Sequence, residues 1–191
     1  MKLLESLKVL SIRMRTPSHV THAQHTCRHI VSFREASRIG LLYEDSDSGR
    51  TFSSRFCDHM YLQGKSVAML GYSRAENTSL KAMSERMTPH SFDLWGRLRS
   101  THVAEFLESH FDYLYHLNLA STALSEYALK LCRAKCRVGF YQSNKQELYD
   151  VMVHLQQTTD ESANHITQNA LDQLLKYTTA LEPDMAFQAS L

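Results

Sequence analysis

The hydrophobic pattern of the chain predicts two strand–helix–strand units. The better defined unit spans residues 111–141. It begins with a mostly apolar, aromatic-rich run at 113–119, which is typical of a strand that is covered on both faces. Residues 123–134 then place apolar side chains at three- and four-residue intervals, which predicts a helix with one buried side. A second apolar run at 136–141 completes the unit, and a helical crossover of this length favours a parallel strand pair.

A second unit of the same kind precedes the first one in the chain. Residues 38–43 and 65–72 are apolar runs that predict buried strands, and residues 52–62 predict a helix that closes near Gly64. The polar segment 44–50 is expected to be a solvated turn that caps this helix. Two such units predict an α/β fold, a three-layer sandwich around a mostly parallel sheet of the Rossmann-like or flavodoxin-like kind.

The remaining segments carry weaker patterns. Residues 75–90 are polar and weakly helical, residues 91–97 form either a short edge strand or a loop, and residues 102–110 predict a short helix. Residues 147–155 fit a strand and a helix equally well, and residues 161–181 predict a final helix.

The chain is expected to form one domain with an arm and a tail. Its 191 residues suffice for one well-buried core. Residues 1–36 form a basic, histidine-rich helical arm, residues 37–181 the single α/β domain, and residues 182–191 a flexible tail. In the arm, residues 2–15 place apolar side chains on one helical face, which can dock on the domain, on a partner protein or on an anionic membrane. We favour a protein surface.

Charge is distributed unevenly along the chain, although the net charge is only +1. Residues 1–38 carry seven Lys and Arg against two acids, and residues 145–191 carry two against seven. Either the basic end meets an anionic partner, or the two ends neutralise each other. A second basic cluster lies at 130–137, with no acid among its members. These two regions supply the residues predicted to contact RNA or another anion, which are Lys8, Arg13, Arg15, Arg28, Lys130, Arg133, Lys135 and Arg137.

Histidines and cysteines do not combine into a predicted metal site. His19, His22, His25 and His29 share one side of a helix if the arm is helical, and His25 and His29 have the spacing that helical metal sites use. No carboxylate lies within this stretch to complete or orient them, so we predict solvated or partner-facing histidines and no metal or cofactor. The four cysteines form no CxxC motif and are expected to be reduced, packed thiols.

Polar side chains at the ends of the predicted strands form a candidate ligand rim. Asp45 and Asp47 follow the first predicted strand, Arg74 follows the second, and Asn118 lies at the end of the strand at 113–119. Because the carboxyl ends of parallel strands meet at one edge of a sheet, these side chains are expected to face the same edge. The acidic segment resembles half of a calcium loop, but Phe56 stands where the distal Glu is required. No GxGxxG or GxxxxGK[ST] phosphate loop is present.

The first ten residues are not expected to form a targeting signal. They are apolar but are interrupted by Glu5 and Lys8, and they lack a cleavage site of small residues. No apolar run in the chain approaches the length of a membrane span. We therefore predict neither export nor a transmembrane helix, and we expect a cytoplasmic location, which reduced thiols also fit.

Several short motifs between residues 30 and 180 are shared with a known group of proteins. They lie at 39–42, 71–72, 92–96, 111–119, 134–139, 149–152 and 173–177. Together they resemble an uncharacterised family of small α/β proteins from Bacteroidota bacteria. The resemblance implies a cytoplasmic setting and supplies no activity, because the family has no established one. The histidine-rich segment 19–29 has no counterpart in it.

Three functions remain open from the sequence. We predict first a non-catalytic α/β binding protein that joins a larger cytoplasmic assembly, with structured RNA such as the ribosome as its anionic partner. The alternatives are an enzyme or nucleotide-binding protein that uses the ligand rim, and a protein–protein interaction module that uses residues 2–15. Because no GxSxG or comparable catalytic signature is present, an enzyme is the less favoured of these functions.

Overall fold

A six-stranded parallel sheet forms the centre of the protein. The computed structural model describes residues 10–11, 31–73, 86–155 and 168–180. Its strands are β1 (Arg38–Glu44), β2 (Ser66–Tyr72), β3 (Arg86–Met87), β4 (His110–Leu117), β5 (Arg133–Phe140) and β6 (Val151–Val153). All neighbouring pairs are parallel, and the order is β3-β2-β1-β4-β5-β6. This is the strand order of the doubly wound dinucleotide-binding folds, so the sheet is of the Rossmann-like kind.

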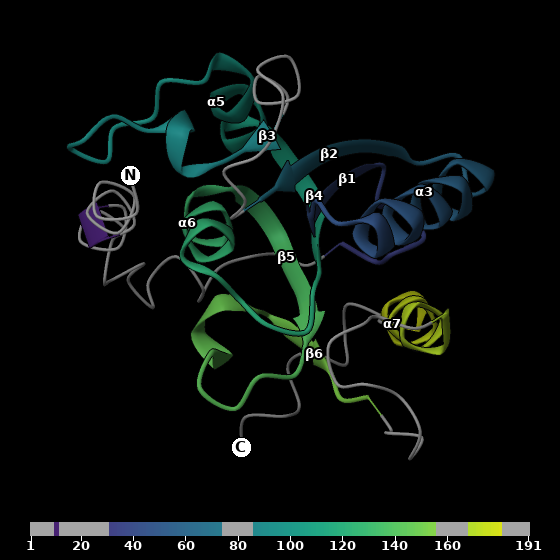
Figure 1. Ribbon diagram of the computed structural model, residues 1–191. Helices are drawn as coiled ribbons and strands as arrows, with labels where there is room; N and C mark the ends of the chain where they lie inside the picture. Colours follow the sequence, from purple (N-terminus) through teal and green to yellow (C-terminus); the bar gives the residue numbers. More distant parts are fainter. Residues whose placement is uncertain (1–9, 12–30, 74–85, 156–167, 181–191) are drawn as a thin grey trace.

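Helices cover both faces of this sheet, which confirms the predicted three-layer sandwich (Figure 1). They are α3 (Asp47–Leu62), α5 (Thr101–Glu108), α6 (Ala123–Leu131) and α7 (Gln168–Thr179), with the 3₁₀ turns η1 (Pro89–Ser91) and η2 (Gln146–Leu148). α3 and α7 pack on one face, and α5 and α6 pack on the other. Each face has its own cluster of buried apolar side chains, as the apolar sequences of the strands predicted.

The unit predicted at 111–141 is present with shifted boundaries. Thr122 caps α6 in a capping box. The helix ends at Leu131, and β5 begins at Arg133, three residues earlier than predicted. Ala134 is buried in the strand just as it would be in a continued helix. The spacing of apolar residues therefore could not show where helix gives way to strand.

The polar segment 44–50 caps the next helix, as predicted, but most of it is already helical. α3 begins at Asp47, five residues earlier than expected. The hydroxyl of Ser46 accepts a hydrogen bond of 3.0 Å from the N–H of Gly49, which satisfies a free donor of the first turn. Only two residues therefore separate the end of β1 from the start of α3.

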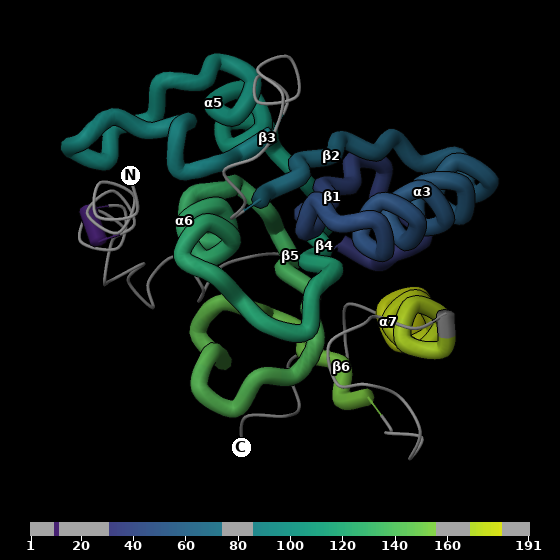
Figure 2. Tube along the Cα trace, in the orientation of Figure 1, coloured from purple at the N-terminus to yellow at the C-terminus, as the bar shows by residue number. Residues whose placement is uncertain are grey.

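Tertiary contacts decide the secondary structure of the segments whose sequence patterns are weaker. Residues 147–155 are neither one helix nor one strand, because η2 is followed by the edge strand β6. Of residues 91–97, Ser91 ends η1, and the others belong to a loop between η1 and α5 that extends away from the sheet (Figure 2), with Trp95 72% exposed. Of residues 75–90, only the end is described, as β3 and part of η1. The two remaining predicted helices are present as α5 and α7.

Only two residues of the first half of the predicted arm are described. Leu10 and Ser11 are helical, and the backbone oxygen of Ser11 lies 3.0 Å from the position that a Cβ would take at Gly96. Gly96 has a φ of +73°, so glycine suits both its backbone and this close contact. The rest of residues 1–30 and the predicted tail lie outside the described residues. Within the described part, no helix is long and apolar enough to cross a membrane.

Candidate functional site

The carboxyl ends of β1 and β4 lie side by side at the switch point of the sheet. From these two central strands the order runs outward to β3 on one side and to β6 on the other. In open α/β sheets, ligands bind at this point, beyond the carboxyl ends of the strands. Glu44 is the last residue of β1, and Asn118 directly follows β4. The Asn118 amide donates a hydrogen bond of 2.5 Å to Oε2 of Glu44, so the two side chains meet across the switch point.

A buried histidine lies behind this pair. His116 of β4 is fully buried, with Nε2 2.9 Å from the hydroxyl of Tyr72 and Nδ1 2.7 Å from the hydroxyl of Tyr149. Burial lowers the pKa of His116 to about 3, so the ring is neutral near neutral pH. A neutral imidazole has one donor and one acceptor, and therefore one tyrosine donates to the ring while the other accepts from it.

Further hydrogen bonds extend these contacts in both directions. The hydroxyl of Tyr72 accepts a hydrogen bond of 3.1 Å from the Asn118 amide. The Gln142 amide donates to the hydroxyl of Tyr149 over 3.4 Å, and its oxygen accepts from the N–H of Ser121 before α6. Burial raises the pKa of Tyr149, so its hydroxyl stays protonated. We call the following set the strand-end network: Glu44, Tyr72, His116, Asn118, Gln142 and Tyr149.

The strand-end network is buried at its centre and reaches solvent at its ends. Tyr72, His116 and Tyr149 are buried, whereas Glu44 and Asn118 are partly exposed. Among the described residues, only Asn118 donates a hydrogen bond to the Glu44 carboxylate. A partly exposed carboxylate can accept several hydrogen bonds, so this arrangement suits a ligand that donates them through hydroxyl or amino groups.

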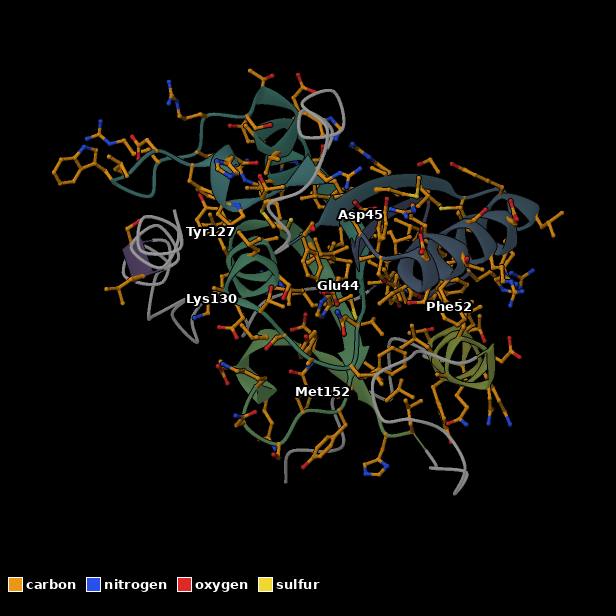
Figure 3. All side chains as sticks on the ribbon, viewed as in Figure 1. Glu44, Asp45, Phe52, Tyr127, Lys130 and Met152 are labelled. Carbon is orange, nitrogen blue, oxygen red and sulfur yellow. The ribbon has the colours of Figure 1, made fainter. Side chains whose placement is uncertain are left out.

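Asp45, predicted as a rim residue, is instead held in ion pairs that connect elements of the fold. Its carboxylate pairs with Arg50 at 2.7 Å and also with Arg86, and its side chain is only 5% exposed. These ion pairs join the end of β1 to α3 and β3. Asp47 is fully exposed, pairs with Arg50 at 2.5 Å, and lies outside the strand-end network. Figure 3 shows Glu44 and Asp45 between α6 and α3.

Of the four predicted rim residues, the structure brings only Asn118 into the strand-end network. Arg74 lies outside the described residues. Glu44 and Tyr72 end β1 and β2, so the same strand-end argument applies to them. Gln142 and Tyr149 could not be inferred from strand ends, because they come from the turn after β5 and the segment before β6. His116 lies inside β4, where its signal in the sequence is a basic side chain within an otherwise apolar and aromatic run.

Potential metal ligands and thiols do not form a second site in the described residues. No group of three or more His, Cys, Asp or Glu side chains there is arranged to hold a metal ion. His25 and His29 lie outside the described part of the chain. Cys57, Cys132 and Cys136 are buried free thiols, as predicted. Burial raises the pKa of Cys57 to about 11 and that of Cys132 to about 12, so neither is a reactive thiolate near neutral pH.

The predicted basic cluster beside α6 does not form one exposed surface. Arg137 is only 3% exposed and donates a hydrogen bond of 3.2 Å to the backbone oxygen at the end of α6. Lys135 is half-exposed and pairs with Asp112 at 2.8 Å. Lys130 is partly buried in the last turn of α6, and Arg133 is exposed. The predicted anion contacts of the arm, Lys8, Arg13, Arg15 and Arg28, lie outside the described residues.

Asp112 joins three segments at the amino ends of the strands, and its removal should destabilise the fold. Its carboxylate accepts hydrogen bonds from the N–H groups of Ser37 (2.9 Å) and Arg38 (3.0 Å) and from Lys135. Burial raises the pKa of Asp112, but these donors outweigh burial and the pKa falls to about 2. Asp112→Ala should lower the free energy of unfolding by about 2 kcal/mol, because two backbone donors lose their acceptor.

Urea unfolding near neutral pH measures this change. The control is Asp58→Ala, which removes an exposed acid of α3 and should stay within about 0.5 kcal/mol of the parent protein. Because the folded-state pKa of Asp112 lies below the unfolded value, its contribution is present above about pH 4 and is lost as the pH falls towards 2. Equal stability of the two variants would contradict this role of Asp112.

A family model matches residues 8–181, which is most of the chain. The chain belongs to a family of unknown function, DUF6913. The match includes every strand and every member of the strand-end network. It confirms the predicted resemblance to an uncharacterised family, and it assigns no activity. No curated protein and no solved structure matches the chain.

Proposed function

We propose that the protein binds a small molecule with adjacent hydroxyl groups, such as the ribose of a nucleoside, at the strand-end network. The observation that carries this proposal is the hydrogen-bonded pair of Glu44 and Asn118 across the switch point between β1 and β4. In folds with this strand order, an acidic side chain at a strand end accepts hydrogen bonds from ribose hydroxyls. The strand order supports this ligand by analogy between folds, and the Glu44 carboxylate supports it through its capacity to accept hydrogen bonds.

The charges at this edge disfavour an anionic ligand. Glu44 places a carboxylate within the site. The charges of Asp45 and Asp47 are together balanced by Arg50 and Arg86, so the carboxylate of Glu44 is the remaining charge among these five side chains. Phosphate sites in such folds use a glycine-rich turn and a free helix N-terminus, whereas the turn before α3 is acidic. The ligand is therefore neutral or cationic at the end that meets Glu44.

The buried part of the strand-end network orients the exposed part. The oxygen of the Asn118 amide accepts a hydrogen bond of 3.1 Å from the N–H of Ala120. This contact turns the NH₂ group towards Glu44 and Tyr72, and Tyr72 is held in turn by His116. A side chain that is already oriented loses less conformational entropy when a ligand binds.

Thermal unfolding with added adenosine, ribose or inorganic phosphate tests the proposal. Adenosine should raise the melting temperature, because a ligand that binds only the folded state stabilises it, and phosphate should not. Glu44→Gln should weaken adenosine binding by about 10- to 100-fold, since a hydrogen bond to a charged group contributes about 1.5–3 kcal/mol. The matched control is Asp47→Asn, which removes a carboxylate at the same edge and should leave adenosine binding unchanged.

Three outcomes contradict this function. The first is a rise in melting temperature with phosphate and not with adenosine or ribose. The second is an equal response of Glu44→Gln and Asp47→Asn to adenosine. The third is failure of every compound to stabilise the parent protein.

The other functions expected from the sequence remain predictions. Contact with RNA in a larger assembly cannot use the cluster at 130–137 as a whole, because Arg137 is buried. An interaction module at 2–15 concerns residues that lie almost entirely outside the described part. An origin in Bacteroidota and a cytoplasmic location likewise stay predictions.

A further inference from the structure

The amino edge of the sheet, opposite the strand-end network, gathers basic side chains from three neighbouring strands. β1 begins with Arg38, β4 with His110 and β5 with Arg133, and β4 lies between the other two. His110 and Arg133 are paired in the register of β4 and β5. All three are exposed, and Lys135 of β5 is half-exposed. We call Arg38, His110, Arg133 and Lys135 the amino-edge surface.

The positive charge of this surface is only partly compensated. The carboxylate of Asp112 pairs with Lys135 and accepts two backbone hydrogen bonds. Within the described chain, the side chains of Arg38 and Arg133 form no ion pair or hydrogen bond. Asp112 therefore balances one cation, and the two arginines remain for an external anion.

Groups next to the amino-edge surface do not cancel this charge. The buried Arg137 donates to the carbonyl at the end of α6, so the negative end of that helix is already compensated. The exposed acids closest along the chain are Glu35 and Glu108, and they are matched in number by Arg34 and Lys130. Among the residues that the structure describes, the local charge balance therefore stays positive.

An exposed aromatic side chain lies at the end of the helix that leads back to this edge of the sheet. α3 ends with Tyr61 and Leu62, which are 56% and 88% exposed. β2 begins four residues after Leu62, at Ser66, which is paired with Arg38. Cations and an exposed ring at one edge suit unpaired RNA, because phosphates pair with the cations and bases stack on the ring.

We infer that the amino-edge surface binds the phosphate groups of a structured RNA and that Tyr61 stacks on an unpaired base. Arginine suits this task, because its guanidinium binds a phosphate through two parallel N–H donors. Neighbouring strands are about 4.8 Å apart, and the register offsets Arg38 on β1 from Arg133 on β5 by two residues of about 3.3 Å each. The two residues are therefore about 12 Å apart and contact different phosphates. Regularly placed cations on rigid strands favour a phosphate chain over a lipid surface.

Fluorescence anisotropy with a labelled RNA hairpin tests this inference on the full chain, at about 50 to 300 mM KCl. The test variant is Arg38→Ala/Arg133→Ala. The matched control is Arg97→Ala/Arg99→Ala, which removes the same charge from exposed arginines before the N-terminus of α5. The test variant should bind the hairpin at least about tenfold more weakly. A plot of the logarithm of the binding constant against the logarithm of the salt concentration should have a slope that is shallower by about 1.5, because two phosphate contacts are lost. The control should behave like the parent protein.

Three results would overturn the inference. The first is an equal loss of affinity in both double variants, which would reflect net charge only. The second is binding to phosphatidylserine vesicles without binding to the hairpin, which would make the edge a membrane contact. The third is no binding of the hairpin by the parent protein at low salt. The thermal response of Arg38→Ala/Arg133→Ala to adenosine should be that of the parent, which separates this test from that of the proposed function.

Discussion

Acidification from about pH 7 to about pH 4 should destabilise the protein by about 3 kcal/mol through His116 alone. Burial lowers the pKa of His116 from 6.5 to about 3 in the folded state. Below pH 6.5 the unfolded chain binds a proton that the folded protein does not bind, so the free energy of unfolding falls as the pH falls. The loss continues until the pH reaches the folded-state value, because only there does the folded protein also take up the proton.

Urea unfolding at a series of pH values measures this loss. His116→Gln keeps a donor and an acceptor between the two tyrosines but does not titrate. Its stability should be lower than that of the parent protein near neutral pH and nearly constant down to about pH 4. His102→Gln, at an exposed histidine of α5, is the matched control and should keep the full pH dependence.

Titration of Asp112 does not contribute to the loss of stability between pH 7 and about pH 4, because the stabilisation by Asp112 is lost only below about pH 4. Constant stability of the parent protein over the whole range would show that His116 takes up its proton in the folded state at the same pH as in the unfolded chain. That result would contradict the lowered pKa of the buried ring.

Gly49→Ala should lower the free energy of unfolding by about 3 kcal/mol. Alanine inside a helix is normally the better residue by about 1 kcal/mol. At Gly49, however, a Cβ would lie 1.9 Å from the backbone oxygen of Glu44. That oxygen also accepts a hydrogen bond of 2.8 Å from the N–H of Ser46, so it cannot move without shifting the end of β1. The first turn of α3 packs so closely on β1 that only glycine fits.

Gly64→Ala separates this close approach from an effect of backbone conformation. Gly64 has a φ of +73°, but a Cβ there would meet no atom within 4 Å. Alanine at this position should cost about 1 kcal/mol, for the left-handed backbone alone. Thermal and urea unfolding should therefore rank Gly49→Ala as clearly the less stable variant. Gly49→Ala should also weaken adenosine binding, because the displaced residue is Glu44. Equal stabilities of the two variants would contradict the close packing of α3 on β1.

The central strands were predictable from sequence, and the packing of individual polar residues was not. A strand that is covered on both faces needs a run of apolar residues whatever its neighbours are, so β1, β2, β4 and β5 stand out in the sequence. Arg137 lies in such a run, and its charge placed it in a predicted surface cluster. The structure buries it under α6, where a backbone oxygen accepts its hydrogen bond. Burying a cation costs free energy unless hydrogen bonds compensate it, and the oxygen at the end of α6 accepts one of the hydrogen bonds of Arg137.

The candidate site was predictable only to the extent that it consists of strand ends. Asn118 was placed at the carboxyl edge because parallel strands end together. Asp45 was placed there by the same argument, but its two arginine partners come from α3 and β3, and their contacts turn it into a framework residue. Charge and position along the chain do not show which carboxylate is paired and which is open to a ligand.

The sequence by itself determined the α/β class, the parallel sheet, the helix caps and the reduced, buried thiols. These features depend on local spacing and on the polarity of each residue, which act within one element. Only the tertiary structure decided which of the two predicted sheet types formed, that Glu44 meets Asn118, and that His116 lies neutral between two tyrosines. These features depend on side chains that are 33 to 74 residues apart in the chain. Such pairs form only after the strands are aligned, because alignment sets the distance between their side chains.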